Sequence, residues 1–210
     1  MPVIHIVDDD KDFRVAVTRL LQASGYEVCA YESAHEFLKA ERSSVPGCVL
    51  LDVSMPDMSG LELQQELARH EEQLPIIFLT GHGDIPMSVR AIQAGAIDFL
   101  TKPVKREPLL EAIERALAHD ALARATREQT RALRGRFGAL TPRERQVFDE
   151  VTAGKSSKQI AVELGTAERT IKAHRANLME KMHVSSVAEL ARAAEQLRAV
   201  EVRLHHPQSH

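Results

Sequence analysis

The chain has 210 residues, a hydrophobic fraction of 44% and a formal net charge of -3. That length suits one large domain or two small ones, and the apolar fraction is ordinary for a globular protein, which argues against disorder. No apolar run approaches the ~20 residues of a membrane-spanning helix, and the N-terminus lacks a signal-peptide pattern, so we expect a cytoplasmic protein that does not bind a membrane. Cys29 and Cys48 lie in apolar runs and are expected to be reduced core residues.

The charge is unevenly distributed along the chain. Residues 1–104 contain 8 Lys and Arg against 16 Asp and Glu, residues 105–138 contain 8 against 5, and residues 139–210 contain 11 against 9. An acidic first part followed by mildly basic segments favours two domains with different partners, although two ordinary surfaces would give the same pattern.

Five apolar segments alternate with segments of helical periodicity in the first part of the chain. The predicted strands are 3–7, 27–31, 47–52, 75–80 and 98–101, and the predicted helices begin near Asp12, Ser33, Leu61, Ile85 and Arg106. This alternation is typical of an α/β fold with a doubly wound parallel sheet. In the flavodoxin-like strand order 2-1-3-4-5, strands one, three, four and five end side by side on one edge of the sheet.

Acidic residues occur where these strands end. Asp8 and Asp9 follow the first strand, and Asp52 ends the third, which is apolar enough to be buried on both faces. A single carboxylate in such a place is commonly a helix or turn cap. Three of them at one edge repel one another, however, and a divalent cation such as Mg²⁺ would neutralise them and attract a phosphoryl donor. Thr80 ends the fourth predicted strand and would supply a hydrogen bond to the transferred group. Lys102 follows the fifth predicted strand and would supply positive charge to it.

The fifth helix has no obvious stop signal after it begins. Residues 118–134 are rich in Ala, Arg, Glu and Leu and contain neither Pro nor Gly, which favours a semi-rigid helical spacer that breaks at Gly135 and Gly138. The alternative is a partly disordered charged linker. We therefore divide the chain into a first domain (1–120), a helical linker (121–138), a second domain (139–204) and a tail (205–210).

The second domain is predicted to be all helical, with four helices. The residues expected to cap or open these helices are Thr141, Ser156, Thr166 and Ser186. Gly165 would end the second helix, the third would cover 167–182, and the fourth would end near Val202. A short helix, a tight turn and a longer helix form a helix-turn-helix.

Several of these residues belong to one known set of motifs. The segments that carry it, over about 104 residues, are Val7-Asp8-Asp9, Leu51-Asp52, Met55-Pro56, Ser59-Gly60, Thr80-Gly81 and Lys102-Pro103. Together they resemble two-component response-regulator receiver domains. The resemblance implies that a histidine kinase phosphorylates Asp52, and that Thr80 and Phe99 form a switch in which Phe99 swings inward. It also implies a Mg²⁺ site made by Asp8, Asp9, Asp52 and the carbonyl of Ser54. Lys102-Pro103 is commonly a cis peptide in such domains.

Two further segments, Leu140–Val147 and Thr170–Leu178, resemble a LuxR-type output domain. The full pairing is similar to the FixJ/NarL group of transcription regulators, which implies a homodimer on phosphorylation and a helix over 167–182 that enters the major groove of double-stranded DNA. The expected DNA-binding residues are Arg169, Thr170, Lys172, Ala173, His174, Arg175 and Ala176. Helical spacing places Arg169, Lys172, Ala173 and Ala176 on one face and turns Ile171, Leu178 and Met182 inward. Alternatively, Arg169 and Lys172 are solvated surface charges on a packing helix.

Two other functions fit parts of the chain. An enzyme with an aspartyl nucleophile, such as a phosphatase or phosphotransferase, usually has a second carboxylate two residues after the nucleophile. Ser54 occupies that position here, and the helix-turn-helix would have no role, so we do not expect an enzyme. The other possibility is an adaptor whose receiver acts by protein contact alone. His205, His206 and His210 could bind a metal, but a solvated terminus is the simpler interpretation.

Overall fold

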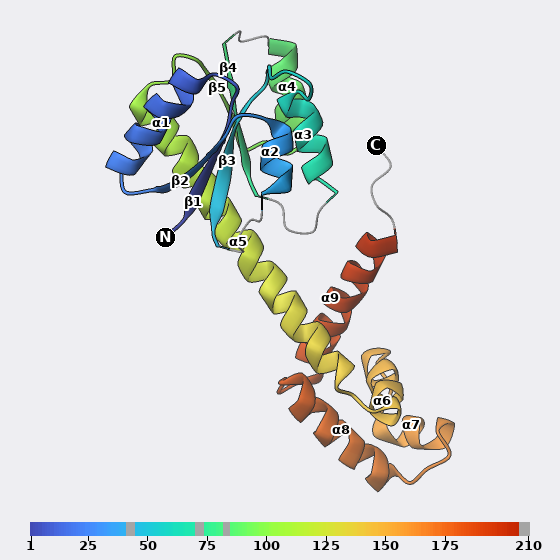
Figure 1. Ribbon diagram of the computed structural model, residues 1–210. Helices are drawn as coiled ribbons and strands as arrows, with labels where there is room; N and C mark the ends of the chain where they lie inside the picture. The colour runs from blue at the N-terminus through green and yellow to red at the C-terminus, as the bar shows by residue number, and fades with distance from the viewer. Residues whose placement is uncertain (41–44, 70–73, 82–84, 206–210) are drawn as a thin grey trace. The chain divides into compact units, whose positions relative to one another are not determined.

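The computed structural model describes residues 1–40, 45–69, 74–81 and 85–205 (Figure 1). The chain divides into two compact units, Met1–Arg124 and Ala125–His210, which are described separately. Within the described segments, no helix combines the length and the apolar character that crossing a membrane requires. His206 and His210 of the predicted tail lie outside the described residues, as does the side chain of His205.

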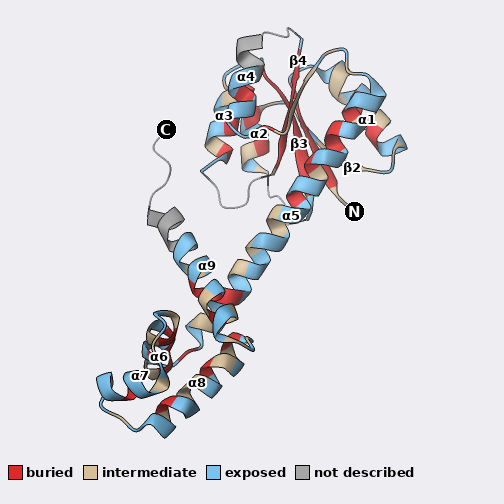
Figure 2. Cartoon of the chain, turned by 180° about the vertical axis from the view of Figure 1, so that it is seen from behind, coloured by how far each residue is buried: buried red, intermediate tan, exposed pale blue. Residues whose placement is uncertain are grey.

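The first unit contains a five-stranded parallel sheet in the predicted order β2-β1-β3-β4-β5. Its strands are β1 (Val3–Val7), β2 (Glu27–Tyr31), β3 (Gly47–Asp52), β4 (Ile76–Thr80) and β5 (Asp98–Thr101). The helices that alternate with them are α1 (Lys11–Ala23), α2 (Ala34–Lys39), α3 (Gly60–Leu67), α4 (Ile85–Gln93) and α5 (Arg106–Gly138). β1, β3 and β4 are buried along their whole length (Figure 2), because helices cover both faces of the sheet.

The two faces of the sheet carry separate apolar cores. Cys48 and Leu50 of β3 pack with side chains of α1 and α5, whereas Val49 and Leu51 pack with side chains of α2, α3 and α4. A slip of the strand by one residue would exchange the two sets, so the register of β3 is strongly determined. That register holds Asp52 at the end of the strand.

The two cysteines differ in their surroundings. Both are free thiols, but Cys48 is buried in β3 and Cys29 is only half-buried. Because Cys29 lies on β2, one of the two edge strands of the sheet, fewer elements cover it. The expectation of a core position is therefore correct for Cys48 and wrong for Cys29.

The second unit is all helical. With the last part of α5, it contains α6 (Pro142–Thr152), α7 (Ser157–Glu163), α8 (Glu168–Met182) and α9 (Val187–His205). The capping boxes predicted at Thr141 and Ser156 are present, and the turn between α7 and α8 passes through Gly165 at φ 61°. α7 and α8 therefore form the expected helix-turn-helix.

Two predictions about helix ends in this part of the chain are wrong. Thr166 does not cap α8, whose N-cap is Ala167 without a side-chain hydrogen bond. Instead the Thr166 N–H donates to the Ala161 carbonyl, so Thr166 completes the end of α7. Gly135 does not break α5, which continues to Gly138. An interior glycine costs a helix only about 1 kcal/mol, and Leu133 and Phe137 of the same stretch pack into the core of the second unit.

Candidate functional site

Three aspartates meet at the edge of the sheet where β1 and β3 end. Carboxylate oxygens of Asp8, Asp9 and Asp52 all lie within 4.8 Å of one another. Asp8 and Asp52 are buried, whereas Asp9 is exposed. β1 and β3 are paired neighbours with Val7 opposite Leu51, so the residues that end these strands come together although they are distant in the sequence.

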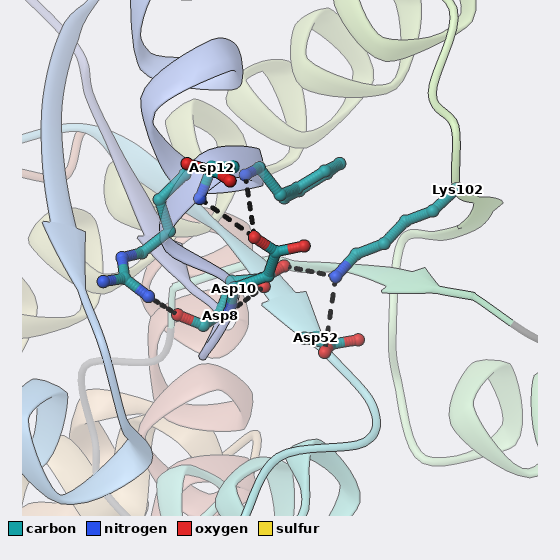
Figure 3. Close-up of polar contacts among 7 residues, drawn as sticks. Asp8, Asp10, Asp12, Asp52 and Lys102 are labelled. Carbon is teal, nitrogen blue, oxygen red and sulfur yellow. Dashed lines mark hydrogen bonds and ion pairs between the residues drawn. The ribbon is translucent and has the colours of Figure 1, made fainter.

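Lys102 lies between two of these carboxylates. Its Nζ is 2.6 Å from Asp8 Oδ2 and 3.3 Å from Asp52 Oδ2 (Figure 3). The residue directly follows β5, its N–H donates to the Thr80 carbonyl at 2.7 Å, and its peptide bond to Pro103 is cis. Burial raises the pKa of the Asp8 carboxyl, and the hydrogen bond and positive charge of Lys102 oppose that rise. The ammonium group therefore helps to keep a buried carboxylate charged.

The last aspartate of the acidic run is a helix cap. Asp10 is the N-cap of α1, and its Oδ1 accepts hydrogen bonds from the N–H groups of Asp12 and Phe13 at 2.9 and 3.1 Å (Figure 3). The Asp10 N–H in turn donates to Asp8 Oδ1 at 3.0 Å, and Arg14 Nη1 donates to the Asp8 carbonyl at 2.6 Å. The start of α1 thus orients Asp8. This role was not predicted, although an Asp directly before an amphipathic helix is the usual N-cap signal.

α3 begins in close contact with the end of β3. A Cβ atom at Gly60 would lie 2.2 Å from the Asp52 carbonyl oxygen, and the Gly60 N–H donates to the Val53 carbonyl at 3.0 Å. Ser59 caps the helix through a capping box with Glu62. The loop after Asp52 therefore folds back on the strand end, and only glycine fits at its point of closest approach.

The other predicted residues of this site lie on neighbouring elements. Thr80 ends β4 and is 2% exposed, one residue beyond the position paired with Asp52. Phe99 of β5 is half-buried, with its ring centroid 6.3 Å from that of Phe78. Ser54 follows the strand end and is exposed. The structure thus brings Asp8, Asp9, Asp52 and Lys102 together, while the roles of Ser54, Thr80 and Phe99 stay predictions.

The donor atoms of the aspartate cluster fit a hard divalent cation. Mg²⁺ is bound in proteins by one or two carboxylates together with water and phosphate oxygens. Asp8, Asp9 and Asp52 offer one oxygen each within a common sphere, and two of these carboxylates are buried. These residues could therefore hold Mg²⁺.

α8 divides into an exposed and a buried face. The residues predicted to share one face of this helix are all exposed, namely Arg169, Lys172, Ala173 and Ala176. The residues predicted to turn inward are all buried, namely Ile171, Leu178 and Met182.

Two cations on α8 already have partners within the second unit. Lys172 Nζ lies 2.9 Å from Glu168 Oε1 on the same helix, and both side chains are exposed. Arg175 Nη1 donates to Ser157 Oγ at 3.0 Å, which joins α8 to α7. Thr170 and His174 are half-buried. The assignment of these side chains to DNA stays a prediction.

Comparisons with known proteins agree with both parts of the chain. Residues 4–114 match the model of the response regulator receiver domain, and residues 138–194 match that of the luxR family of bacterial regulatory proteins. Response regulator protein TmoT of Ectopseudomonas mendocina is 47% identical over 196 residues, which cover 93% of this chain and 89% of that protein. Transcriptional regulatory protein FixJ of Rhizobium meliloti is 41% identical over 191 residues, which cover 91% of this chain and 94% of that protein.

A solved structure shows the same likeness. The structure of response regulator StyR matches with a TM-score of 0.82 at 46% sequence identity, and the match covers 93% of this chain and 98% of that one. The sheet order, the aspartate cluster with its lysine and the helix-turn-helix all agree with these matches. The chain belongs to the FixJ/NarL group of two-component response regulators, which are transcription regulators with a receiver domain and a LuxR-type helix-turn-helix DNA-binding domain.

Proposed function

We propose that Asp52 accepts a phosphoryl group from a cognate sensor histidine kinase in a Mg²⁺-dependent step, and that phosphorylation promotes dimerisation and DNA binding. One observation carries the proposal. Asp52 and Asp8 are two buried carboxylates that lie in one cluster with the exposed Asp9, and the Lys102 ammonium is 3.3 Å from Asp52 Oδ2. Like charges are seldom buried together without a purpose, and perturbed ionisable groups gather at functional sites.

Asp52 is the nucleophile of this transfer. One of its carboxylate oxygens attacks the phosphorus atom of a phosphohistidine on the kinase, and a P–O bond forms as the P–N bond breaks. The electron pair of the broken bond stays on the imidazole nitrogen, which takes a proton from water. Lys102 stands where its ammonium group can stabilise the charge on the transferring oxygens.

The surrounding residues prepare the site. Asp8, Asp9, Asp52 and the Ser54 carbonyl would hold Mg²⁺, which offsets the charge of the phosphoryl group and of the carboxylates. Asp8 is oriented for this task by the Asp10 N–H. The close contact between α3 and the end of β3 fixes the strand end that carries the nucleophile.

The phosphoryl group adds roughly two negative charges beside Lys102 and Thr80. We expect the Thr80 hydroxyl to move towards it and Phe99 to turn into the vacated space. Because Phe99 lies on β5, this movement would change the surface that β5 makes with α4, whose side chains at residues 85–88 lie outside the described residues. A two-fold dimer through this surface would present two copies of α8 to half-sites about one DNA turn apart.

DNA binding is assigned to the exposed face of α8. Arg169 and Lys172 would contact phosphates or bases, and the small side chains of Ala173 and Ala176 would allow close approach to the groove. Residues 139–210 carry 11 Lys and Arg against 9 Asp and Glu, so a single copy has little net attraction for DNA. This balance supports binding as a dimer.

Phosphorylation is tested with acetyl phosphate as a small donor. Asp52→Asn should abolish labelling in the presence of Mg²⁺ while the protein stays folded. Asp57→Asn is the matched control, because it makes the same change on an exposed residue of the next loop whose φ of 66° suits asparagine. Asp9→Ala should weaken the dependence of labelling on Mg²⁺ concentration. Stoichiometric labelling of Asp52→Asn would refute the assignment.

Dimerisation is tested separately by sedimentation of the full chain with and without the phosphodonor. The phosphorylated protein should sediment as a dimer at the protein concentrations at which it binds fragments of genomic DNA in a pull-down. A monomer under those conditions would overturn the proposed mechanism of activation but not the assignment of Asp52.

A further inference from the structure

Lys102 has a third partner besides the two carboxylates. Its Nζ lies 4.3 Å from the centroid of the Phe13 ring on α1, in addition to its distances of 2.6 Å to Asp8 and 3.3 Å to Asp52. The Lys102 side chain is only 17% exposed, and Phe13 is half-buried. The ammonium group is therefore enclosed by two carboxylates and one aromatic ring.

We propose that Phe13 is a positioning residue for phosphoryl transfer, whose ring holds the Lys102 ammonium group where it can reach the phosphoryl oxygens. The inference rests on the proposed function, because it takes Lys102 to be the group that contacts the phosphoryl oxygens. In this proposal Phe13 acts only through its contact with Lys102.

The two carboxylate partners of Lys102 both change during the proposed reaction. Asp52 uses an oxygen to form the new P–O bond, and Asp8 would be one of the residues that hold Mg²⁺. A lysine positioned by these two carboxylates alone would lose both contacts during phosphoryl transfer. Its ammonium group would then be free to move, because the four-carbon side chain is flexible.

The Phe13 ring is a partner that does not change. The backbone N–H of Phe13 donates to Asp10 Oδ1 at 3.1 Å, and the ring packs against the core formed by α1, α5 and the sheet. An aromatic face attracts an ammonium group through its quadrupole but carries no net charge, so it leaves the positive charge available to a phosphoryl group. The ring also covers one side of the ammonium group from water, which strengthens its remaining electrostatic interactions.

The test compares substitutions that remove the ring with substitutions that retain it. Phe13→Leu and Phe13→Met keep an apolar side chain, whereas Phe13→Tyr and Phe13→Trp keep an aromatic face. With acetyl phosphate and Mg²⁺, we expect the ring-free variants to be labelled about three- to tenfold more slowly at saturating donor, and the aromatic variants to keep a rate near that of the wild type. Val15→Ala, an exposed change on the same helix, should have no effect.

A second measurement needs neither Mg²⁺ nor phosphorylation. The chain contains no tryptophan, so Phe13→Trp introduces a single fluorophore at this position. In the metal-free protein its emission should change when Lys102→Met is added, and should not change with Lys105→Met, which alters an exposed lysine nearby. This comparison reports contact between the ring and the ammonium group, which a role in packing alone would not produce.

The outcomes separate this inference from the function on which it rests. If the wild-type protein is not labelled, the proposed function fails and the inference fails with it. If the wild type is labelled and Asp52→Asn is not, but ring-free variants are labelled at the wild-type rate, only the role of Phe13 is wrong. Aromatic variants that lose as much rate as Phe13→Leu would also overturn it, as would emission that does not respond to Lys102→Met.

Discussion

Gly60→Ala tests whether the contact between α3 and the end of β3 sets the position of Asp52. The added methyl carbon would lie 2.2 Å from the Asp52 carbonyl oxygen and 3.1 Å from the carbonyl carbon. Non-bonded heavy atoms pack at about 3.5 Å or more. Either α3 or the strand end must therefore move away by roughly 1 Å. The carbonyl carbon and oxygen of Asp52 are backbone atoms, so they cannot relieve the contact by rotation of a side chain.

The expected cost has two parts. Overpacking of a close contact destabilises a protein by about 1–3 kcal/mol, against a total stability of about 5–15 kcal/mol, so most molecules stay folded. A reactive group misplaced by about 1 Å can lose on the order of 10²-fold in rate. We therefore expect Gly60→Ala to lower the labelling rate per folded molecule by about one to two orders of magnitude.

Gly47→Ala is the matched control for this experiment. A Cβ atom there would lie 2.3 Å from the Val3 carbonyl oxygen, a contact of nearly the same severity at the opposite end of β3. Urea unfolding should show that both variants are less stable than the wild type, and labelling with acetyl phosphate should be slow only in Gly60→Ala. Equal rates per folded molecule in the two variants would refute the proposed role of the contact.

Three further predictions concern other parts of the chain. The hydrogen bond from Lys181 lowers the pKa of the Glu144 carboxyl below its ordinary value of 4.5. The stabilisation from the charged carboxylate is therefore fully present at pH values above 4.5 and is lost as the pH falls through the lowered pKa. Glu144→Gln should cost about 1 kcal/mol at neutral pH and converge with the wild type in acid denaturation; a constant difference would contradict this. Burial raises the pKa of the Cys48 thiol to about 12, so a thiol reagent at mildly alkaline pH should modify Cys29 alone in the native protein and both in denaturant. Lys172→Ala should reduce the salt slope of DNA binding by about 0.9 for a phosphate contact, or cost about 1–3 kcal/mol for a base contact, and unchanged binding would remove it from the interface.

The parts of the structure that follow from repeated patterns could be predicted from the sequence. Apolar strands that alternate with amphipathic helices have few compact arrangements, and right-handed crossovers bring the ends of β1 and β3 together. The cluster of Asp8 and Asp52 with Lys102 follows from that topology. The opposite faces of α8 follow likewise from its helical period, since every residue predicted to turn inward is buried.

Two of the predictions that failed concern single residues whose local preference was weaker than a neighbouring interaction. Thr166 is a good N-cap residue, but its N–H completes the end of α7 by bonding to Ala161, and the cap position falls to Ala167. Gly135 disfavours a helix, but packing of the surrounding turns outweighs its small cost. Helix propensity describes a residue and its immediate neighbours in the sequence. The helix ends at these positions depend on contacts with other residues, which propensity does not include.

Phe13 illustrates a different limit. Its place in the apolar stripe of α1 correctly indicates that it packs against the core, and that explanation leaves nothing in the pattern to suggest a second contact. The contact arises because Lys102, far away in the sequence, extends from the end of β5 towards the start of α1. A motif names the charged residues of a site, whereas the contact of a neutral side chain such as Phe13 with one of those charges is seen only in the fold. Substitutions at such positions should therefore be judged by their effect on the charged residue as well as by the volume that they remove.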